Sequence, residues 1–234
     1  MLDYLQGILE NEPYNYTLKC DTLNAISFGA PQRRERFIMV GLKKDLNIEY
    51  TYPEATFTEG SYRTVRDAIS DIQDIEPGKE VTDSYFTLPP HPEAQGLEKE
   101  LRGRCLHNHI TTATRETALS RFKALKAGEN FHDLSPELKT TYSNAERTQN
   151  TIYMRLKYDE PSGTVVNVRK SMWIHPELDR AISIREAARL QTFPDSFIFE
   201  GTKDSQYQQV GNAVPPFLAK AVAESIISIL NQVQ

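Results

Sequence analysis

Apolar residues recur at regular spacing near the two ends of the chain. Leu2, Leu5, Ile8 and Leu9 share one face of a helix predicted over residues 2–9. Residues 16–26 and 37–42 have the composition of strands. A helix is predicted over residues 64–75, because Val65, Ala68, Ile69 and Ile72 form one apolar stripe.

The C-terminal part contains two strong helix signals. Ser183 and Glu186 have the spacing of a capping box, and the helix that they begin should end before Pro194. A second helix is predicted from the Pro-Pro pair at 215–216, because proline is tolerated in a first turn. Its apolar stripe consists of Phe217, Leu218, Ala221, Val222, Ser225, Ile226, Ile229 and Leu230.

The middle of the chain, residues 76–170, is polar and less periodic. It contains a Pro-Pro-His-Pro run at 89–92, a helix predicted over 113–127, and short strands predicted over 153–158 and 163–168. We interpret this stretch as a separate, loop-rich domain.

Composition and charge exclude several classes of protein. The 234 residues are 39% hydrophobic and 25% charged, which is typical of a folded protein and not of a disordered one. The net charge of −5 means that nucleic-acid binding would depend on local clusters. Two distant cysteines, no signal-peptide pattern and no membrane-length apolar run predict a cytoplasmic protein.

The stretch ISFGAPQRRERFIMVG at residues 26–41 places three arginines directly before an apolar run. In an extended segment Gln32, Arg34 and Arg36 would point to one side and form a strip of hydrogen-bond donors. Arginine's rigid fork suits phosphate oxygens and base edges. The alternative, which the chemistry alone favours, is a solvated charged loop that leads into a strand.

Three segments together resemble a known family. FGAPQRRERFIMVG resembles the eighth conserved motif of DNA cytosine-5 methyltransferases, with its Pro-Gln-x-Arg-x-Arg core. Residues 174–199, IHPELDRAISIREAARLQTFPDSFIF, resemble the ninth motif, and residues 207–226, YQQVGNAVPPFLAKAVAESI, resemble the tenth. Their order matches that of the family, with a variable region between the first and the second.

The resemblance implies roles for particular residues. Gln32, Arg34 and Arg36 would contact the DNA backbone and the extruded target cytosine. Asn212, Ala213 and Val214 would help to wall the S-adenosylmethionine pocket, although Asn212 also suits a simple helix start. The implied partner is double-stranded DNA with a flipped cytosine.

Other basic residues are candidates for DNA contacts. Arg185 and Arg189 lie on the capped helix, where packing or solvated surface positions are the competing interpretations. Between residues 102 and 126 stand one acid, Glu116, and six basic residues: Arg102, Arg104, Arg115, Arg121, Lys123 and Lys126. This basic island, with Arg169 and Lys170, could contact DNA backbone or be an ordinary solvated face.

A metal-dependent nuclease is not supported. His107, Asn108 and His109 spell HNH as adjacent residues, but nucleases of that name have those residues separated on a metal-binding scaffold. With Cys105 and Cys20 they also lack the usual zinc spacing, so core or surface histidines are predicted and no metal.

Three motifs on which the family's reaction depends do not occur in this sequence. The reaction needs a Pro-Cys nucleophile that attacks cytosine C6, a Glu-Asn-Val motif, and a Phe-x-Gly-x-Gly cofactor loop. Here Cys20 follows Lys19, Cys105 follows Arg104, and no two glycines are spaced Gly-x-Gly. We therefore predict the C-terminal portion of such an enzyme, inactive alone, as a shortened chain more readily than as a subunit of a split enzyme.

The predicted fold class is α/β, with a partial Rossmann-like S-adenosylmethionine-dependent methyltransferase sheet and a smaller loop-rich target-recognition domain. Residues 1–66 and 205–234 would be the remnant of the catalytic domain, and residues 67–204 the recognition domain and hinge. An exposed sheet edge predicts self-association or binding of the enzyme's N-terminal half. The alternatives are a non-catalytic DNA-binding module and an interaction scaffold without a DNA role.

Overall fold

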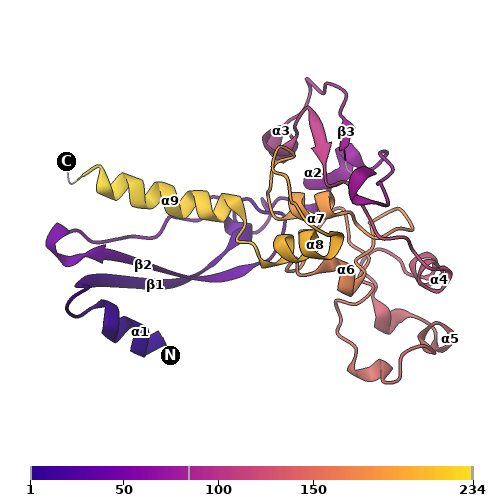
Figure 1. The fold of residues 1–234 in the computed structure, drawn as a ribbon, viewed down its shortest axis with the longest axis horizontal. Coiled ribbons are helices and arrows are strands. Elements are labelled where there is room, and N and C mark those ends of the chain that lie inside the picture. Colours follow the sequence, from indigo (N-terminus) through magenta and orange to yellow (C-terminus); the bar gives the residue numbers. More distant parts are fainter. Residues whose placement is uncertain (1, 84, 233–234) are drawn as a thin grey trace.

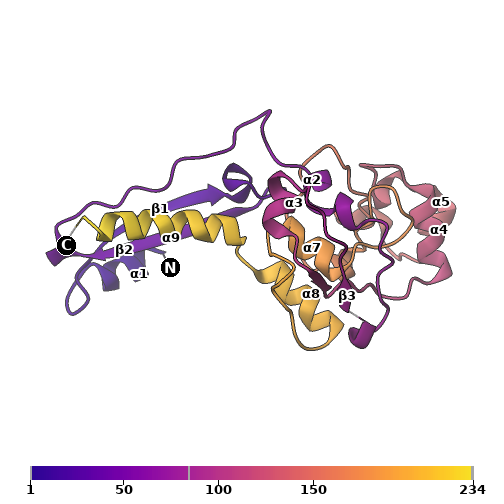
Figure 2. The same cartoon turned by 90° about the horizontal axis from the view of Figure 1, so that it is seen from above.

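The computed structural model describes residues 2–83 and 85–232, and it has two lobes (Figures 1 and 2). A slender hairpin lobe, residues 2–63 and 214–232, extends from a larger lobe, residues 64–83 and 85–213. The elements are α1 Leu2–Leu9, β1 Tyr16–Asn24, β2 Glu35–Lys43, α2 Val65–Ile69, β3 Tyr85–Thr87, α3 Gly96–Leu101, β4 Cys105–His107, α4 Glu116–Ala124, α5 Pro136–Lys139, α6 Val168–Ser171, α7 Ile184–Leu190, α8 Lys203–Asn212 and α9 Pro216–Leu230.

The hairpin lobe is a two-stranded antiparallel ribbon that α9 covers on one face. β1 and β2 pair from Tyr16 opposite Lys43 to Asn24 opposite Glu35. The predicted stripe of α9 packs against this ribbon, with Leu218 buried and Val222 partly buried against Leu23 and its neighbours. Further along α9, the Ser225 hydroxyl is 2.7 Å from the Tyr50 hydroxyl. α1 lies at the N-terminus as predicted, and none of its residues is buried.

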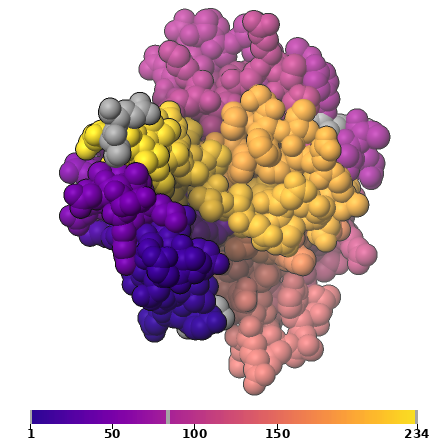
Figure 3. Space-filling view, turned by 60° about the vertical axis from the view of Figure 1, so that its left-hand side comes forward, coloured from indigo at the N-terminus to yellow at the C-terminus, as the bar shows by residue number. Residues whose placement is uncertain are grey.

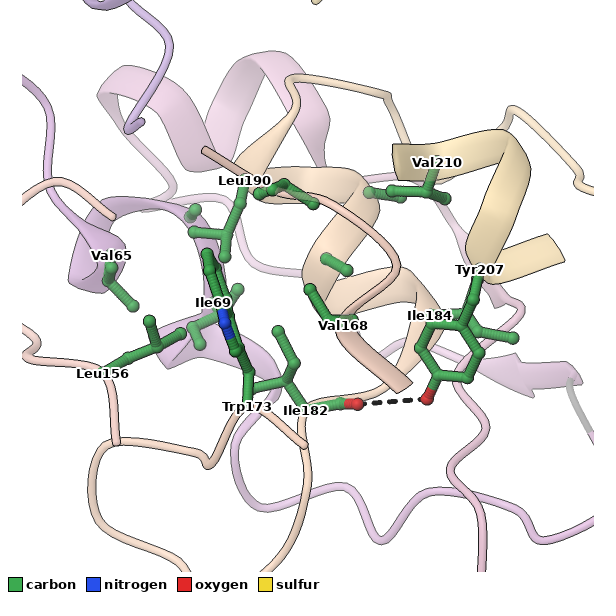
Figure 4. Packing of buried hydrophobic residues seen from close by; sticks show 14 of the residues in the cluster. Val65, Ile69, Leu156, Val168, Trp173, Ile182, Ile184, Leu190, Tyr207 and Val210 are labelled. Carbon is green, nitrogen blue, oxygen red and sulfur yellow. Dashed lines mark hydrogen bonds between the residues drawn. The ribbon is translucent and has the colours of Figure 1, made fainter. Parts of the chain in front are cut away.

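The larger lobe is built around one hydrophobic cluster. Trp173 lies close to Ile69, Leu156 and Ile182, and the Tyr207 hydroxyl donates to the Ile182 carbonyl oxygen at 3.1 Å (Figure 4). The residues come from the helices α2, α3, α6, α7 and α8 and from the irregular segments between them. Burial of this cluster therefore holds together segments that have little regular structure of their own.

The predicted Rossmann-like sheet is not present in the part of the chain that the structure describes. That part contains two small antiparallel sheets, β1 with β2 and β3 with β4, and parallel pairing occurs only as isolated bridges such as Gln32 with Ser162. A short connection folds β1 back on β2, whereas parallel neighbours need a long crossover between them. The fold is α/β without a central parallel sheet.

Several predicted elements need correction. The helix predicted over 64–75 is α2, which ends at Ile69 and continues as a 3-10 turn. The strands predicted over 153–158 and 163–168 do not form. Only Arg155 makes a bridge in the first, and in the second the Val165 N–H binds the Gln32 side chain. Helix α8 was not predicted, because its sequence KDSQYQQVGN is mostly polar.

α8 packs in the larger lobe, through Tyr207 and Val210, and α9 packs on the hairpin. Figure 3 shows α9 in yellow against the violet part of the hairpin lobe, with the indigo N-terminal segment below and the orange segment that leads into α9 to the right. No single described helix is long and apolar enough to cross a membrane. Only α8 and α9 taken together, with a 43° bend between them, meet the criteria of length and composition. The division into functional domains stays a prediction.

Candidate functional site

Gln32 lies at the joint between the two lobes. Its side chain is fully buried, and its Nε2 atom donates to the Leu190 carbonyl oxygen and the Gln191 Oε1 atom, each at 3.0 Å. Its Oε1 atom accepts from the Val165 N–H at 3.1 Å. One carboxamide therefore ties the start of β2 to the end of α7 and to the segment before α6.

Arg34 makes a second connection at the same joint. Its Nη1 atom donates to the Val165 carbonyl oxygen at 2.6 Å, and its Nη2 atom donates to those of Gly211 and Ala213 at 2.7 and 2.8 Å. The side chain is 1% exposed. Burial, and then the charge of Arg36, lower the pKa of Arg34 to about 10, so the guanidinium is charged at neutral pH.

The two other arginines of this stretch are accessible. Arg33 is exposed, and Arg36 is half-buried with its Nη1 atom donating to the Glu35 carbonyl oxygen at 2.7 Å. A solvated charged loop is therefore the wrong interpretation for Gln32 and Arg34, whose polar groups mostly bind the protein itself. Direct contact with another molecule is left to Arg33 and Arg36. The assignment of Gln32, Arg34 and Arg36 to DNA stays a prediction.

The turn at 211–214 packs closely against the main chain at Val166. A Cβ atom on Gly211 would lie 2.7 Å from the Val166 carbonyl carbon, so glycine permits a close backbone approach here. The Asn212 and Val214 side chains are exposed, and the Asn212 Oδ1 atom accepts from Gln208. An amide and an apolar side chain thus remain on the open side of the turn, which suits one wall of a pocket for a polar ligand.

The arginines of α7 are structural. Arg189 is fully buried and binds the Asp195 carboxylate with two nitrogens, at 2.8 and 2.7 Å. Arg185 is also fully buried, and it donates to the carbonyl oxygens of His107 and Pro194 at 2.7 and 2.8 Å. The packing interpretation of this helix holds for both arginines, and neither reaches DNA phosphates, because neither has a solvent-facing donor.

The capping box of α7 is present and extends into a buried polar network. The Glu186 carboxylate accepts from the Ser183 N–H and from Arg180. Burial opposes ionisation of Glu186, but the attached Arg180 outweighs it, and the pKa of Glu186 falls well below its usual range. For the two histidines of the network, in contrast, burial is the cause that lowers the pKa: that of His109 falls below its ordinary value and that of His175 falls to about 4. Both imidazoles are therefore neutral near pH 7.

Part of the basic island is also not available for contact with DNA. Arg121 is buried, with donors to the Leu138 carbonyl oxygen and the Tyr153 hydroxyl, and Arg102 is paired with Asp71. Arg121 and Arg102 are therefore structural residues and not DNA contacts. The remaining four, Arg104, Arg115, Lys123 and Lys126, are exposed.

His109 is a core histidine, as predicted. Its Nε2 atom is 2.9 Å from the Ile75 carbonyl oxygen and its Nδ1 atom is 3.0 Å from the Ser183 hydroxyl. Among the described residues no group of three His, Cys, Asp or Glu side chains could hold a metal ion.

Two buried amide side chains that hold the polar groups of the core were not predicted from the sequence. The Asn108 Oδ1 atom accepts a hydrogen bond from Arg185, and the Asn108 side chain also binds the N–H group and the carbonyl oxygen of Phe199. Gln191 accepts from Gln32 and donates to the Val210 carbonyl oxygen. Their signal in the sequence was weak, because a lone amide has no periodicity.

The comparisons with known proteins agree with these motifs. The sequence model of the C-5 cytosine-specific DNA methylase family matches residues 4–228. The type II methyltransferase M.DdeI of Desulfomicrobium norvegicum is 35% identical over 95% of this chain and 58% of its own length. The type II methyltransferase M1.HphI of Haemophilus parahaemolyticus is also 35% identical, over 93% of this chain and 50% of its own length.

A solved structure supports the same fold. It is a putative DNA modification methyltransferase encoded within a prophage of Escherichia coli, with a TM-score of 0.73 and 24% identity. The match covers 92% of this chain and 61% of that one. The chain belongs to the C-5 cytosine-specific DNA methylase family.

The prediction that the chain is the C-terminal portion of such an enzyme was wrong as drawn. The family match over residues 4–228 takes in nearly the whole chain as methylase domain. The chain spans about half the length of the curated relatives it matches, which fits a fragment without marking it as their C-terminal part.

Proposed function

We propose that this chain supplies DNA recognition, and part of the target-cytosine and S-adenosylmethionine pockets, to a DNA cytosine-5 methyltransferase. The observation that carries the proposal is the joint at Arg34. One guanidinium there holds both the strip assigned to the target base, residues 32–36, and the turn assigned to the cofactor, residues 211–214. Two pockets that must meet at one reacting carbon need their walls fixed relative to each other.

Within that site Arg33 and Arg36 would contact the DNA. The buried side chains of Gln32 and Arg34 would not contact it and would fix the position of the strip. S-adenosylmethionine would supply the methyl group, and Asn212, Ala213 and Val214 would form one wall of its pocket. The Asn212 amide can donate to a polar ligand atom, and the exposed Val214 side chain offers apolar contact.

Binding of duplex DNA, measured by fluorescence anisotropy, tests the recognition part. Arg36→Ala should weaken binding several-fold, because it removes a cation from the DNA-facing side. Lys220→Ala removes an equally charged, exposed side chain from α9 and should leave the affinity unchanged. Equal affinity of the Arg36 variant and the parent chain would remove Arg36 from the interface.

The chain alone should not transfer a methyl group, because neither cysteine is in a Pro-Cys motif. Cys20 lies on β1, and the Sγ atom of Cys105 on β4 is 3.1 Å from the Tyr85 hydroxyl. Transfer from labelled S-adenosylmethionine to duplex DNA by the isolated chain would refute this. Activity that appears on mixing with a polypeptide carrying the three missing motifs would support it. DNA binding without activity in the mixture would favour a non-catalytic module.

The edge of the hairpin is the proposed surface for such a partner. β1 and β2 pair only with each other among the described residues, so each strand has one unpaired side. Phe37 on β2 is also 50% exposed. Association in solution scattering is expected, and a monodisperse monomer would count against the proposal.

A further inference from the structure

A pocket of about 600 Å³ lies in the larger lobe, away from the Arg34 joint. Residues 112–115, 117 and 118, α6 and the start of α8 contribute to its wall, together with Tyr153 and Tyr207. These helices are labelled in Figure 1. The strip at residues 32–36 and the turn at 211–214 do not line this pocket, whereas four of the basic residues considered for DNA contacts do.

The wall of the pocket is strongly cationic. It contains Arg115, Arg121, Arg169 and Lys170 against a single carboxylate, Asp204. Asp204 is already paired with Arg169 at 2.8 Å. In the described part of the chain, no side-chain partner binds the Arg115 guanidinium or the Lys170 ammonium. In a protein of net charge −5, such a concentration of unpaired positive charge favours an anion.

The start of α4 adds further donors. Arg115 occupies its N-cap position and makes no side-chain cap. The N–H groups of Ala118 and Leu119 bind the Arg115 carbonyl oxygen, whereas those of Glu116 and Thr117 have no acceptor among the described residues. Free amides at the N-terminus of a nine-residue helix attract anions. Glu116 itself is exposed and does not line the pocket.

A residue of the pocket wall, Thr112, has a polar atom without a partner. The Thr112 hydroxyl oxygen is buried and makes no hydrogen bond within the described residues. The remaining surface is largely apolar, from threonine methyl groups, alanines and Met172. Donors combined with apolar surface suit a sugar–phosphate unit better than a bare inorganic anion.

We infer that this pocket binds a backbone phosphate of duplex DNA through Arg115, Lys170 and the N-terminus of α4. The inference rests on the proposed function, since it adds a second anchoring point to the DNA-recognition role. Phosphate contacts fix the register and orientation of a protein on the duplex without reading its sequence. An anchor at the pocket would therefore orient the larger lobe, while base contacts elsewhere set specificity.

The test uses two charge-matched double variants of the whole chain. Arg115→Ala with Lys170→Ala removes the two unpaired cations of the pocket. Lys99→Ala with Lys157→Ala removes two exposed cations of the same lobe that neither line the pocket nor belong to the basic island. All four residues are on the surface, and equal urea midpoints of the variants would confirm that both fold.

Duplex DNA binding is then measured over a range of salt concentrations. The pocket variant should bind about tenfold more weakly or worse, and the slope of log affinity against log salt should shrink by about 0.9, for the one lost phosphate contact. The control should keep the parental affinity and slope. Equal losses in the two variants, or no loss in either, would overturn the inference.

Asp204→Asn gives a change in the opposite direction. It removes the one carboxylate and frees Arg169, so DNA binding should become tighter; weaker or equal binding would contradict the inference. Inorganic phosphate alone is a further arm. If it binds the parent chain but the pocket variant keeps normal DNA affinity, the pocket serves a small phosphate compound and not DNA. A parent chain that binds no DNA at all would instead refute the proposed function.

Discussion

The Nη2 atom of Arg34 donates a hydrogen bond of 2.7 Å to the carbonyl oxygen of Gly211, across 177 positions of sequence. The bond joins the strip before β2 to the turn before α9. A second bond from the same nitrogen, to the Ala213 carbonyl oxygen, fixes the turn at two points. Two of the segments that resemble the methyltransferase motifs are thus held together by one buried side chain.

Arg34→Ala should destabilise the fold strongly. It leaves three carbonyl oxygens at the joint without their donor and opens a cavity, for which we expect a loss of about 3 kcal/mol in the free energy of unfolding. Arg36→Ala, on a half-exposed side chain, should cost less than about 0.5 kcal/mol. Urea unfolding of both variants measures the difference. Similar midpoints for the two would mean that the buried guanidinium does not hold the joint.

Gly211→Ala should also destabilise, by about 2 kcal/mol or more, because the added Cβ atom would meet main-chain atoms of Val166 and Asn167 that cannot move aside easily. Gly163→Ala is the matched control, since nothing lies within 4 Å of a Cβ atom there. We expect the control to be neutral or slightly stabilising. Thermal unfolding of the pair tests the packing, and equal melting temperatures would refute the close approach.

The sequence predicted the longer helices and strands with the exception of α8, and it missed the short ones other than α2. The stripe on α9 and the capping box of α7 predicted both helices, because each depends on local spacing. The positions of the arginines could not be predicted in the same way. Arg185 and Arg189 look like surface residues on a helical wheel, and their burial depends on acceptors such as Asp195 and Asn108 that approach from other segments.

The family motifs carried more information than the local chemistry did. Gln32 and Arg34 alternate with exposed Arg33 and Glu35, as an extended segment requires, but the face that they share turns inward. Nothing local distinguishes an inward from an outward face when the residues are polar. The two-stranded sheets were missed for a related reason, since strand patterns do not specify how many partners a strand has.

Glu186→Gln should cost about 3 kcal/mol of stability. The change removes one charge of a buried pair and leaves the Arg180 guanidinium without its counter-ion. Glu224→Gln, on an exposed carboxylate of α9, should have almost no effect. Denaturant unfolding at neutral pH distinguishes the two, and a small effect of the Glu186 change would show that the network is not structural.

The stability of the fold should fall as pH drops from 7 to 5. The pKa of His175 is lowered from 6.5 to about 4, chiefly by burial, and Arg180 and Arg155 oppose its protonation while Glu186 favours it. Its Nδ1 atom accepts from the N–H groups of Glu177 and Leu178, so a proton there would break both bonds. The unfolded chain therefore binds the proton more readily, and the stabilisation present above pH 6.5 is lost as pH falls toward 4.

Between pH 7 and pH 5 this group alone should lower the free energy of unfolding by about 2 kcal/mol, and His109, whose pKa is also lowered, adds in the same direction. His175→Gln should flatten this dependence, because a glutamine oxygen can accept the same backbone donors without titrating. His132→Gln, at an exposed position, should leave the slope as it is. Unfolding curves collected across this range measure the slope directly. If the His175 variant keeps the parental slope, other groups cause the pH dependence. Glu186 is not one of them, because the pKa of its carboxylate lies well below this window.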